Sequence, residues 1–210
     1  MNTRRIFVLC FVLLIGGVTF AQSVTPPNAE YRGLKAEGAF RIDNNTDQPM
    51  SVSLETKSFR VDDNGKPVFS PLQARVHLDL GSSGFVLGPH DNHTVYYKAV
   101  STLSALSFAI VPTMTPMTQT KGIRVNFCIP HLIYLYQKSK LTKADVEVAM
   151  HDGKVTIVNH SEKLGRVEFI HVGSDDLNGF PIYPGQTRDI AVAGDKATVH
   201  FEDGFKVDVR

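Results

Sequence analysis

Apolar and polar residues alternate with a period of two along most of this chain. Phe40 and Ile42 alternate with Arg41 and Asp43, and the same pattern returns in 76–80 and 205–209. Side chains two apart lie on one face of a β-strand, whereas one helix face recurs about every 3.6 residues. The alternation therefore predicts strands, each with one buried face, and leaves little of the chain for helices.

Turn sequences divide the alternating runs. Asn64-Gly65, Asp152-Gly153 and Asp203-Gly204 are residue pairs that accept the positive φ of tight hairpin turns. Short strands that follow one another at roughly ten-residue spacing are typical of a β-sandwich. We therefore expect an all-β protein.

A weak internal repeat divides the chain in two. A strand that ends at Asn44 is followed by a proline turn at Pro89, and a strand that ends at Asn159 is followed by Pro184-Gly185. A polar stretch, 137–140, lies between the two copies. These features predict two β-sandwich domains, residues 22–138 and residues 139–210. The second is small for a module of seven strands.

Residues 1–21 have the composition of a cleaved export signal. Arg4 and Arg5 precede an apolar run, and Thr19-Phe20-Ala21 places small residues where a signal peptidase cleaves. The apolar run is shorter than the roughly twenty residues that span a bilayer. We therefore expect cleavage before Gln22, export, and a mature chain that does not span the membrane.

The mature chain would keep 189 of the 210 residues, with 20 basic and 21 acidic side chains. This balance lacks the basic surface that nucleic acid requires, so we expect no nucleic-acid partner. The one remaining cysteine, Cys128, cannot form an internal disulfide, so packing alone must hold the domains together. We expect Cys128 to be a packed strand residue; a reactive thiol or a link to another chain is the alternative.

Residues 122–136 carry the clearest functional signal. Apolar residues alternate at Ile123, Val125, Phe127 and Ile129, and 131–136 is apolar on both faces apart from His131. One continuous strand of this length would extend roughly 45 Å, which is far longer than usual. Pro130 has no N–H for a neighbouring strand, so one side should be free there.

A long apolar edge strand promotes aggregation unless something covers it. One interpretation of 122–136 is an ordinary core strand of a sandwich. The other is a strand donated to a partner chain, in which backbone bonds give affinity and alternate side chains fill the partner's pockets.

The chain resembles the periplasmic pilus-assembly chaperones of the chaperone–usher pathway over most of its mature length, most clearly in 31–136. The residues that carry the resemblance are Gly38-Ala39-Phe40-Arg41-Ile42-Asp43-Asn44, Phe85-Val86-Leu87-Gly88-Pro89 with Val95, Phe108-Ala109-Ile110-Val111-Pro112, and Gly122-Ile123-Arg124-Val125. The resemblance implies two immunoglobulin-like domains, a periplasmic location, a pilus or fimbrial subunit as client, and an outer-membrane usher as a further partner.

The resemblance also implies site residues. Family members insert alternate apolar side chains of one strand into an incomplete subunit, and here these would be Ile123, Val125, Phe127 and Ile129. They commonly anchor the subunit's terminal carboxylate with an arginine on the first strand and a lysine at the base of the donor strand. This chain departs from that pattern with Asn28 and His131, so Arg32 and His131 are the expected anchor.

Other chemistry is weakly supported by the sequence. Met114 and Met117, with Met50 and Met150-His151, would suit an exported copper-binding protein, and an adhesive surface protein with the same sandwich is a further alternative. The first interpretation places Met114 and Met117 in a loop, 113–121, and requires no cofactor. No nucleophile motif or paired carboxylates stand out, so we expect no enzyme activity. Asn44, Asn92 and Asn159 begin glycosylation sequons that short polar turns also produce by chance.

Overall fold

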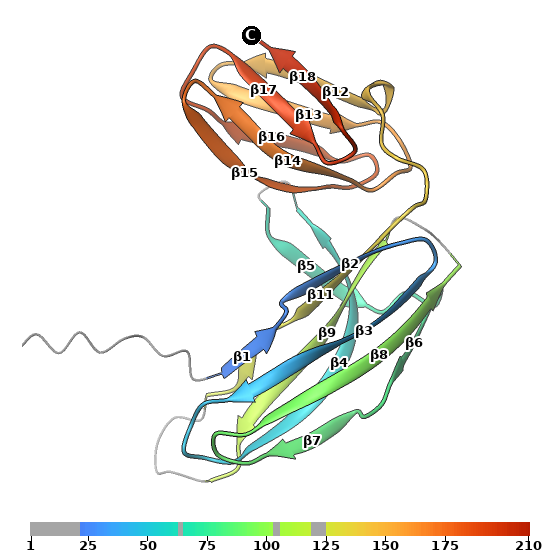
Figure 1. Ribbon diagram of the computed structural model, residues 1–210, viewed down its shortest axis with the longest axis vertical. Coiled ribbons are helices and arrows are strands. Elements are labelled where there is room, and N and C mark those ends of the chain that lie inside the picture. Colours follow the sequence, from blue (N-terminus) through green and yellow to red (C-terminus); the bar gives the residue numbers. More distant parts are fainter. Residues whose placement is uncertain (1–21, 63–64, 103–105, 119–124) are drawn as a thin grey trace, which may run out of the picture.

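The computed structural model describes residues 22–62, 65–102, 106–118 and 125–210. It contains two β-sandwiches, drawn one above the other in Figure 1, and the chain passes from the lower to the upper one once. The sandwiches confirm the expected all-β, two-domain immunoglobulin-like fold. The predicted export signal, 1–21, lies outside the described residues.

The first sandwich is formed by strands β1 to β11 in two sheets. The first sheet has the order β1 (Gln22–Thr25), β3 (Lys35–Asn44), β8 (Asn92–Ser101) and β6 (Val76–Leu80). The second has the order β2 (Asn28–Arg32), β11 (His131–Tyr136), β9 (Leu106–Pro116), β4 (Met50–Val61) and β5 (Pro67–Pro71), with β10 (Phe127–Cys128) on β9 and β7 (Gly84–Leu87) on β4.

The alternating residues of the sequence fill the space between these sheets. Phe40 and Ile42 of β3 and Val95 and Tyr97 of β8 are all buried in one apolar core. Their polar neighbours along the strand, such as Arg41, face solvent. Burying one such apolar side chain stabilises the fold by about 1.5–3 kcal/mol.

The first part of the described chain changes sheets between β1 and β2. Strand β1 pairs antiparallel with β3, while β2 pairs parallel with β11. The two are joined by Pro26 and Pro27, which have no N–H to give to either ladder. Strand β2 therefore begins to cover β11 only from Asn28, which is opposite Leu132.

The second sandwich has seven short strands, although its length is small for such a module. One sheet has the order β12 (Val146–His151), β13 (Lys154–Asn159) and β16 (Thr187–Ala191). The other has the order β15 (Asp175–Ile182), β14 (Gly165–Val172), β17 (Ala197–Phe201) and β18 (Phe205–Val209). A single 3-10 turn, η1 (Lys143–Asp145), precedes β12. The expected boundary between residues 138 and 139 lies in the connection between Tyr136 and this turn.

The internal repeat of the sequence corresponds to a similar turn in each of the two domains. Asn44 and Asn159 are each 0% exposed. The Nδ2 of Asn44 donates to Gln48 O and Gly88 O, and that of Asn159 donates to Lys163 O and Ile182 O. Each asparagine therefore fastens its turn to the end of another strand, and its amide is buried within the fold.

The two domains meet in an apolar and polar interface. Phe59, Tyr134 and Tyr136 of the first domain form one buried cluster with Leu164 of the second. At the edges of this cluster, Gln186 Nε2 donates to Val61 O at 2.8 Å, Arg166 pairs with Glu30 at 2.6 Å, and Arg32 pairs with Asp203 at 3.0 Å. These contacts hold the upper domain against one end of the lower one (Figure 1).

Candidate functional site

The segment expected to be one long strand is two strands in the structure. β10 contains only Phe127 and Cys128, and β11 begins at His131. The expectation of a continuous strand from 122 to 136 is wrong, and Pro130 gives the physical reason because it interrupts the backbone ladder. Ile123, the first of the expected donor residues, lies outside the described residues.

β11 is not an edge strand, since it lies between β9 and β2. Its apolar character on both faces has a different cause. Ile133 and Leu135 point into the first core, while Tyr134 and Tyr136 pack in the cluster between the domains. The half of the apolar segment after Pro130 is therefore covered by the chain itself.

β10, in contrast, has one free edge among the described residues. Phe127 is opposite Met114 and Cys128 is opposite Thr113, both in β9. In the described part of the chain, β10 pairs with β9 alone. Strand β2 covers only β11, and β1, which precedes β2, belongs to the other sheet. The backbone of β10 thus retains unpaired hydrogen-bonding groups on one side.

The side chains around β10 alternate between core and surface. Phe127 and Ile129 are half-buried and pack against the first core, while Val125, two residues before Phe127 and outside β10, departs from the alternation and is 53% exposed. Cys128 is exposed, with its Sγ 3.4 Å from Thr113 Oγ1. The expectation that Cys128 is packed is wrong because its position in the alternation directs it away from the core.

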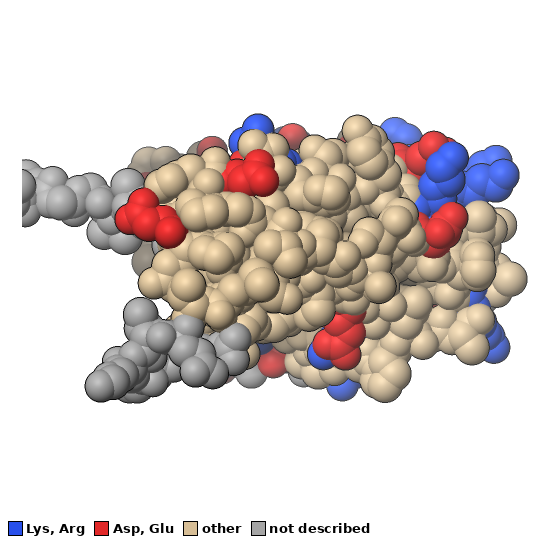
Figure 2. Space-filling view, turned by 90° about the horizontal axis from the view of Figure 1, so that it is seen from below, with Lys and Arg blue, Asp and Glu red and all other residues tan. Residues whose placement is uncertain are grey.

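The outer surface near β10 carries few charges among the described residues. In the second sheet, Ser51 of β4 is opposite Val86 of β7 on one side and Thr115 of β9 on the other. Val86 is 59% exposed, and Met117, which follows β9, is 49% exposed. Figure 2, which views the first domain from below, shows a broad area with few Lys, Arg, Asp or Glu side chains.

His131 is the first residue of β11, and its side chain lies inside the first sandwich. The residue is 0% exposed, with its ring stacked on Phe40. Its Nδ1 is 2.8 Å from Pro26 O and its Nε2 is 3.2 Å from the Tyr97 hydroxyl. Burial lowers the pKa of His131, and the hydrogen bond to Pro26 O offsets this only in part. The imidazole is therefore neutral, with Nδ1–H donating to Pro26 O and Nε2 accepting from Tyr97.

Arg32 lies at the interface between the domains and already has a partner. Its Nη2 is 3.0 Å from Asp203 Oδ1, and its guanidinium lies 5.5 Å from the centre of the Tyr136 ring. Asp203 Oδ2 also accepts from the backbone N–H of Leu141. The structure therefore does not bring the two expected anchor residues together as a pair of free cations.

Sequence reasoning missed a second ion pair at the same interface. Arg166 of β14 is 2.6 Å from Glu30 of β2. Burial raises the pKa of Glu30, although the Arg166 guanidinium opposes this change. The partners are 136 residues apart in the chain, and neither lies in a motif, so only the folded structure identifies them.

The methionines proposed for copper do not form a surface site. β9 extends to Pro116, so 113–116 is strand and the expected loop is wrong for these residues. Met50 and Met114 are buried in the first core, while Met117 is exposed. Among the described residues, no group of three or more His, Cys, Asp or Glu side chains is placed to hold a metal.

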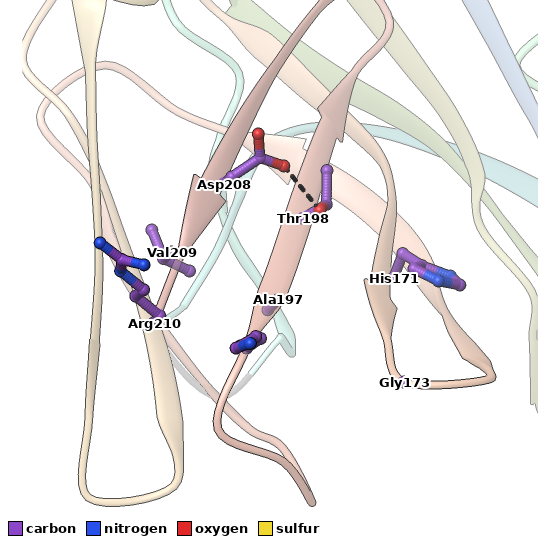
Figure 3. A pocket seen from close by; sticks show the side chains of 8 residues that line it. His171, Gly173, Ala197, Thr198, Asp208, Val209 and Arg210 are labelled. Atoms are coloured by element: carbon purple, nitrogen blue, oxygen red, sulfur yellow. Dashed lines mark hydrogen bonds between the residues drawn. The ribbon is translucent and has the colours of Figure 1, made fainter.

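A pocket of about 540 Å³ lies in the second domain, on the ends of β14, β17 and β18 (Figure 3). The Thr198 hydroxyl there donates to Asp208 at 2.7 Å, and these two residues are directly opposite each other in neighbouring strands. His171 at its rim pairs with Asp176. Thr198 and Asp208 therefore form an ordinary cross-strand contact.

Comparison with solved structures identifies the fold. The chain matches the class 5 fimbriae chaperone CfaA with a TM-score of 0.59 and 11% identity, over 90% of this chain and 99% of that one. It matches a chain of the Salmonella enterica SafA pilin–SafB chaperone complex (TM-score 0.55, 11% identity, 90% and 94% coverage). It matches the E. coli chaperone DraB similarly (0.53, 17%, 90% and 95%).

These likenesses confirm that the chain has the two-domain fold of pilus chaperones. A scan against protein-family models finds no match, and a search of curated proteins finds none either. No helix in the described part of the chain is long and apolar enough to cross a bilayer.

Proposed function

We propose that this chain is a divergent chaperone of the chaperone–usher pathway that binds pilus or fimbrial subunits in the periplasm. The observation that carries the proposal is the free edge of β10, flanked by half-buried apolar side chains, in a chain with the fold of pilus chaperones. Export requires cleavage of residues 1–21, and an outer-membrane usher is the expected second partner. The chain would act by binding alone, without a cofactor or catalysis.

In this proposal an extended segment of the client adds a strand next to β10. Its backbone pairs with the N–H and C=O groups that β9 leaves free, and this supplies affinity with little dependence on sequence. Phe127 and Ile129, together with Val125 and the predicted Ile123, provide alternate apolar side chains for the client's incomplete core. Phe127 and Ile129 are already half-buried against the first core, so binding adds only the burial of their remaining exposed surface, at about 25 cal/mol per Å².

The length of the paired segment is limited at one end by Pro130. This residue lacks an N–H, and from Leu132 onwards β2 already occupies the position beside β11. A client strand can therefore pair along 125–129 and on towards residue 123, but it cannot continue along β11.

The client-carboxylate anchor stays a prediction for His131 and Arg32. Arg32 could bind a carboxylate by exchanging Asp203 for it, since its side chain is 41% exposed. His131 would have to leave its contacts with Pro26 and Tyr97 to do the same. Of the two residues, Arg32 is therefore the stronger candidate for direct contact with a client.

Co-expression with exported subunits encoded nearby tests the proposal. The mature chain is tagged, and the subunit that co-purifies with it is measured for the parent and for Phe127→Asp and Ile129→Asp. Phe69→Asp is the matched control, because Phe69 lies on β5, the opposite edge strand of the same sheet, and is 38% exposed. Circular dichroism and a thermal melt identify the variants that remain folded.

We expect Phe127→Asp and Ile129→Asp to abolish co-purification while Phe69→Asp retains it. If both folded donor variants retain the subunit, strand donation by this segment is wrong. If the parent captures no exported subunit at all, the chaperone role itself is wrong.

A further inference from the structure

Gln22, the first residue of β1, has a buried side chain without a hydrogen-bond partner. The residue is 4% exposed, and neither Oε1 nor Nε2 has a partner in the part of the chain that the structure describes. Val24, two residues on, is buried in the first core, so β1 directs both side chains inward. An unpaired buried amide costs about 1–3 kcal/mol.

The neighbouring buried amide cannot satisfy Gln22. Asn44 is directly opposite in β3, but its Nδ2 donates to Gln48 O and Gly88 O. Its Oδ1 accepts from the hydroxyl and the backbone N–H of Thr46. The Gln22 amide is therefore held in place by packing and by no polar contact.

Cleavage of the export signal, which belongs to the proposed function, would place a new chain end at this residue. If the peptide bond between Ala21 and Gln22 is cut, the nitrogen of Gln22 becomes an α-amine with an ordinary pKa of roughly 7.7–8.0, so it is mostly charged at neutral pH.

We propose that Gln22 of the exported chain is modified to pyroglutamate. The neutral α-amine attacks Cδ of its own side chain, so that the N–Cδ bond forms and the Cδ–Nε2 bond breaks. One proton passes from the amine to Nε2, which leaves as ammonia. The reaction needs no oxidant, reductant or cofactor, and the five-membered lactam retains one N–H and one carbonyl.

The unpaired buried amide explains why the ring suits this position. Ring closure removes the charge of the α-amine and replaces a primary amide, which has two N–H donors, with a lactam that has one. Among the described residues, no hydrogen bond holds the Gln22 amide away from the chain end. Turning the amide towards the amine therefore breaks only its packing contacts. The product presents a blocked, uncharged end to the edge of the first sandwich.

Mass spectrometry of the protein purified after export tests this inference. We expect an intact mass lighter by one ammonia than the encoded residues 22–210, and a first peptide that begins with the ring, after incubation at neutral pH. Gln22→Glu is the control, because its side chain carries no amide nitrogen and cannot release ammonia. It should start at residue 22 with its full encoded mass.

Two results would overturn the inference: a parent chain that starts at Gln22 and keeps its full mass after incubation, or a chain that starts at another residue. Subunit capture by the same preparation separates this inference from the proposed function. Capture by a chain with an open Gln22 refutes the ring alone, and a cyclised chain without capture refutes the chaperone role alone.

Discussion

The imidazole of His131 stacks on the ring of Phe40, with ring centroids 4.5 Å apart and planes inclined by 17°. The pair joins β11 of one sheet to β3 of the other through the centre of the first sandwich. Both ring nitrogens of His131 are also hydrogen-bonded, Nδ1 to Pro26 O and Nε2 to the Tyr97 hydroxyl. His131 is therefore an integral part of the core that supports the base of the candidate strand.

The first prediction concerns the pH dependence of stability. The folded state lowers the pKa of His131, so below about pH 6.5 the unfolded chain takes up a proton that the folded chain does not. The free energy of unfolding should therefore fall as the pH is lowered from 7.5 to 5.5. Urea unfolding at both values measures it, and His131→Gln should show a smaller fall. An equal fall in the variant would assign the effect to other groups.

The second prediction concerns the ion pair between Arg166 and Glu30. Burial raises the pKa of Glu30, so its charged form is already disfavoured in the fold. Because each side chain is 32% exposed, Arg166→Gln, which removes the cation that compensates this charge, should cost about 0.5–1 kcal/mol at pH 7. Glu30→Gln removes the partly buried charge itself and should cost less than Arg166→Gln. Urea unfolding compares the two variants, and equal losses would contradict this account.

The third prediction concerns the repeated asparagine turn. Asn159→Ala removes the donor to Lys163 O and Ile182 O and the acceptor of two hydrogen bonds from Ser161. It should lower the free energy of unfolding by at least about 2 kcal/mol, because buried groups lose their partners. Asn178→Ala, at an exposed position of β15, is the control and should change it little. If Asn159→Ala lowers the free energy of unfolding no more than Asn178→Ala does, the turn is not needed for stability.

The fourth prediction uses the same repeat. The proline turn has a positive φ at Gly185, 67°, and at His90, 56°. A side chain in this region costs roughly 1–2 kcal/mol, so Gly185→Ala should destabilise the second domain by about 1 kcal/mol. His90→Gly relieves its conformation but loses the exposed contact with Asp47, so it should change the stability of the first domain by less than Gly185→Ala changes that of the second. Thermal melts of both variants measure the difference, and destabilisation by His90→Gly alone would contradict it.

The sequence predicts the architecture well because local alternation decides which side chains are buried. The inward set of β3 and the repeat of Asn44 and Asn159 are visible in the residue order alone. The pairing of segments far apart in the sequence decides which strand covers which and which side chains form ion pairs. Nothing local indicates that β2 would cover β11 but not β10, or that Arg32 would find Asp203 at a distance of 171 residues.

The candidate site was therefore only partly predictable. Phe127 and Ile129 follow from the alternation and from the resemblance to pilus chaperones. The break at Pro130 and the burial of His131 follow from how β10 and β11 pack, and β11 is apolar on both faces because the second domain covers Tyr134 and Tyr136.

Cys128 allows the central claim to be tested without altering the donor strand. It lies on β10 and its side chain is exposed, so its alkylation rate can be compared in the free chain and in the chain co-purified with a subunit. A control places the thiol on β5 instead, in a variant that combines Cys128→Ser with Ser70→Cys at an exposed edge position. If a client strand pairs with β10, bound subunit will slow the reaction of Cys128 and leave that of the control thiol unchanged. Equal rates for Cys128 with and without subunit would contradict strand donation at β10.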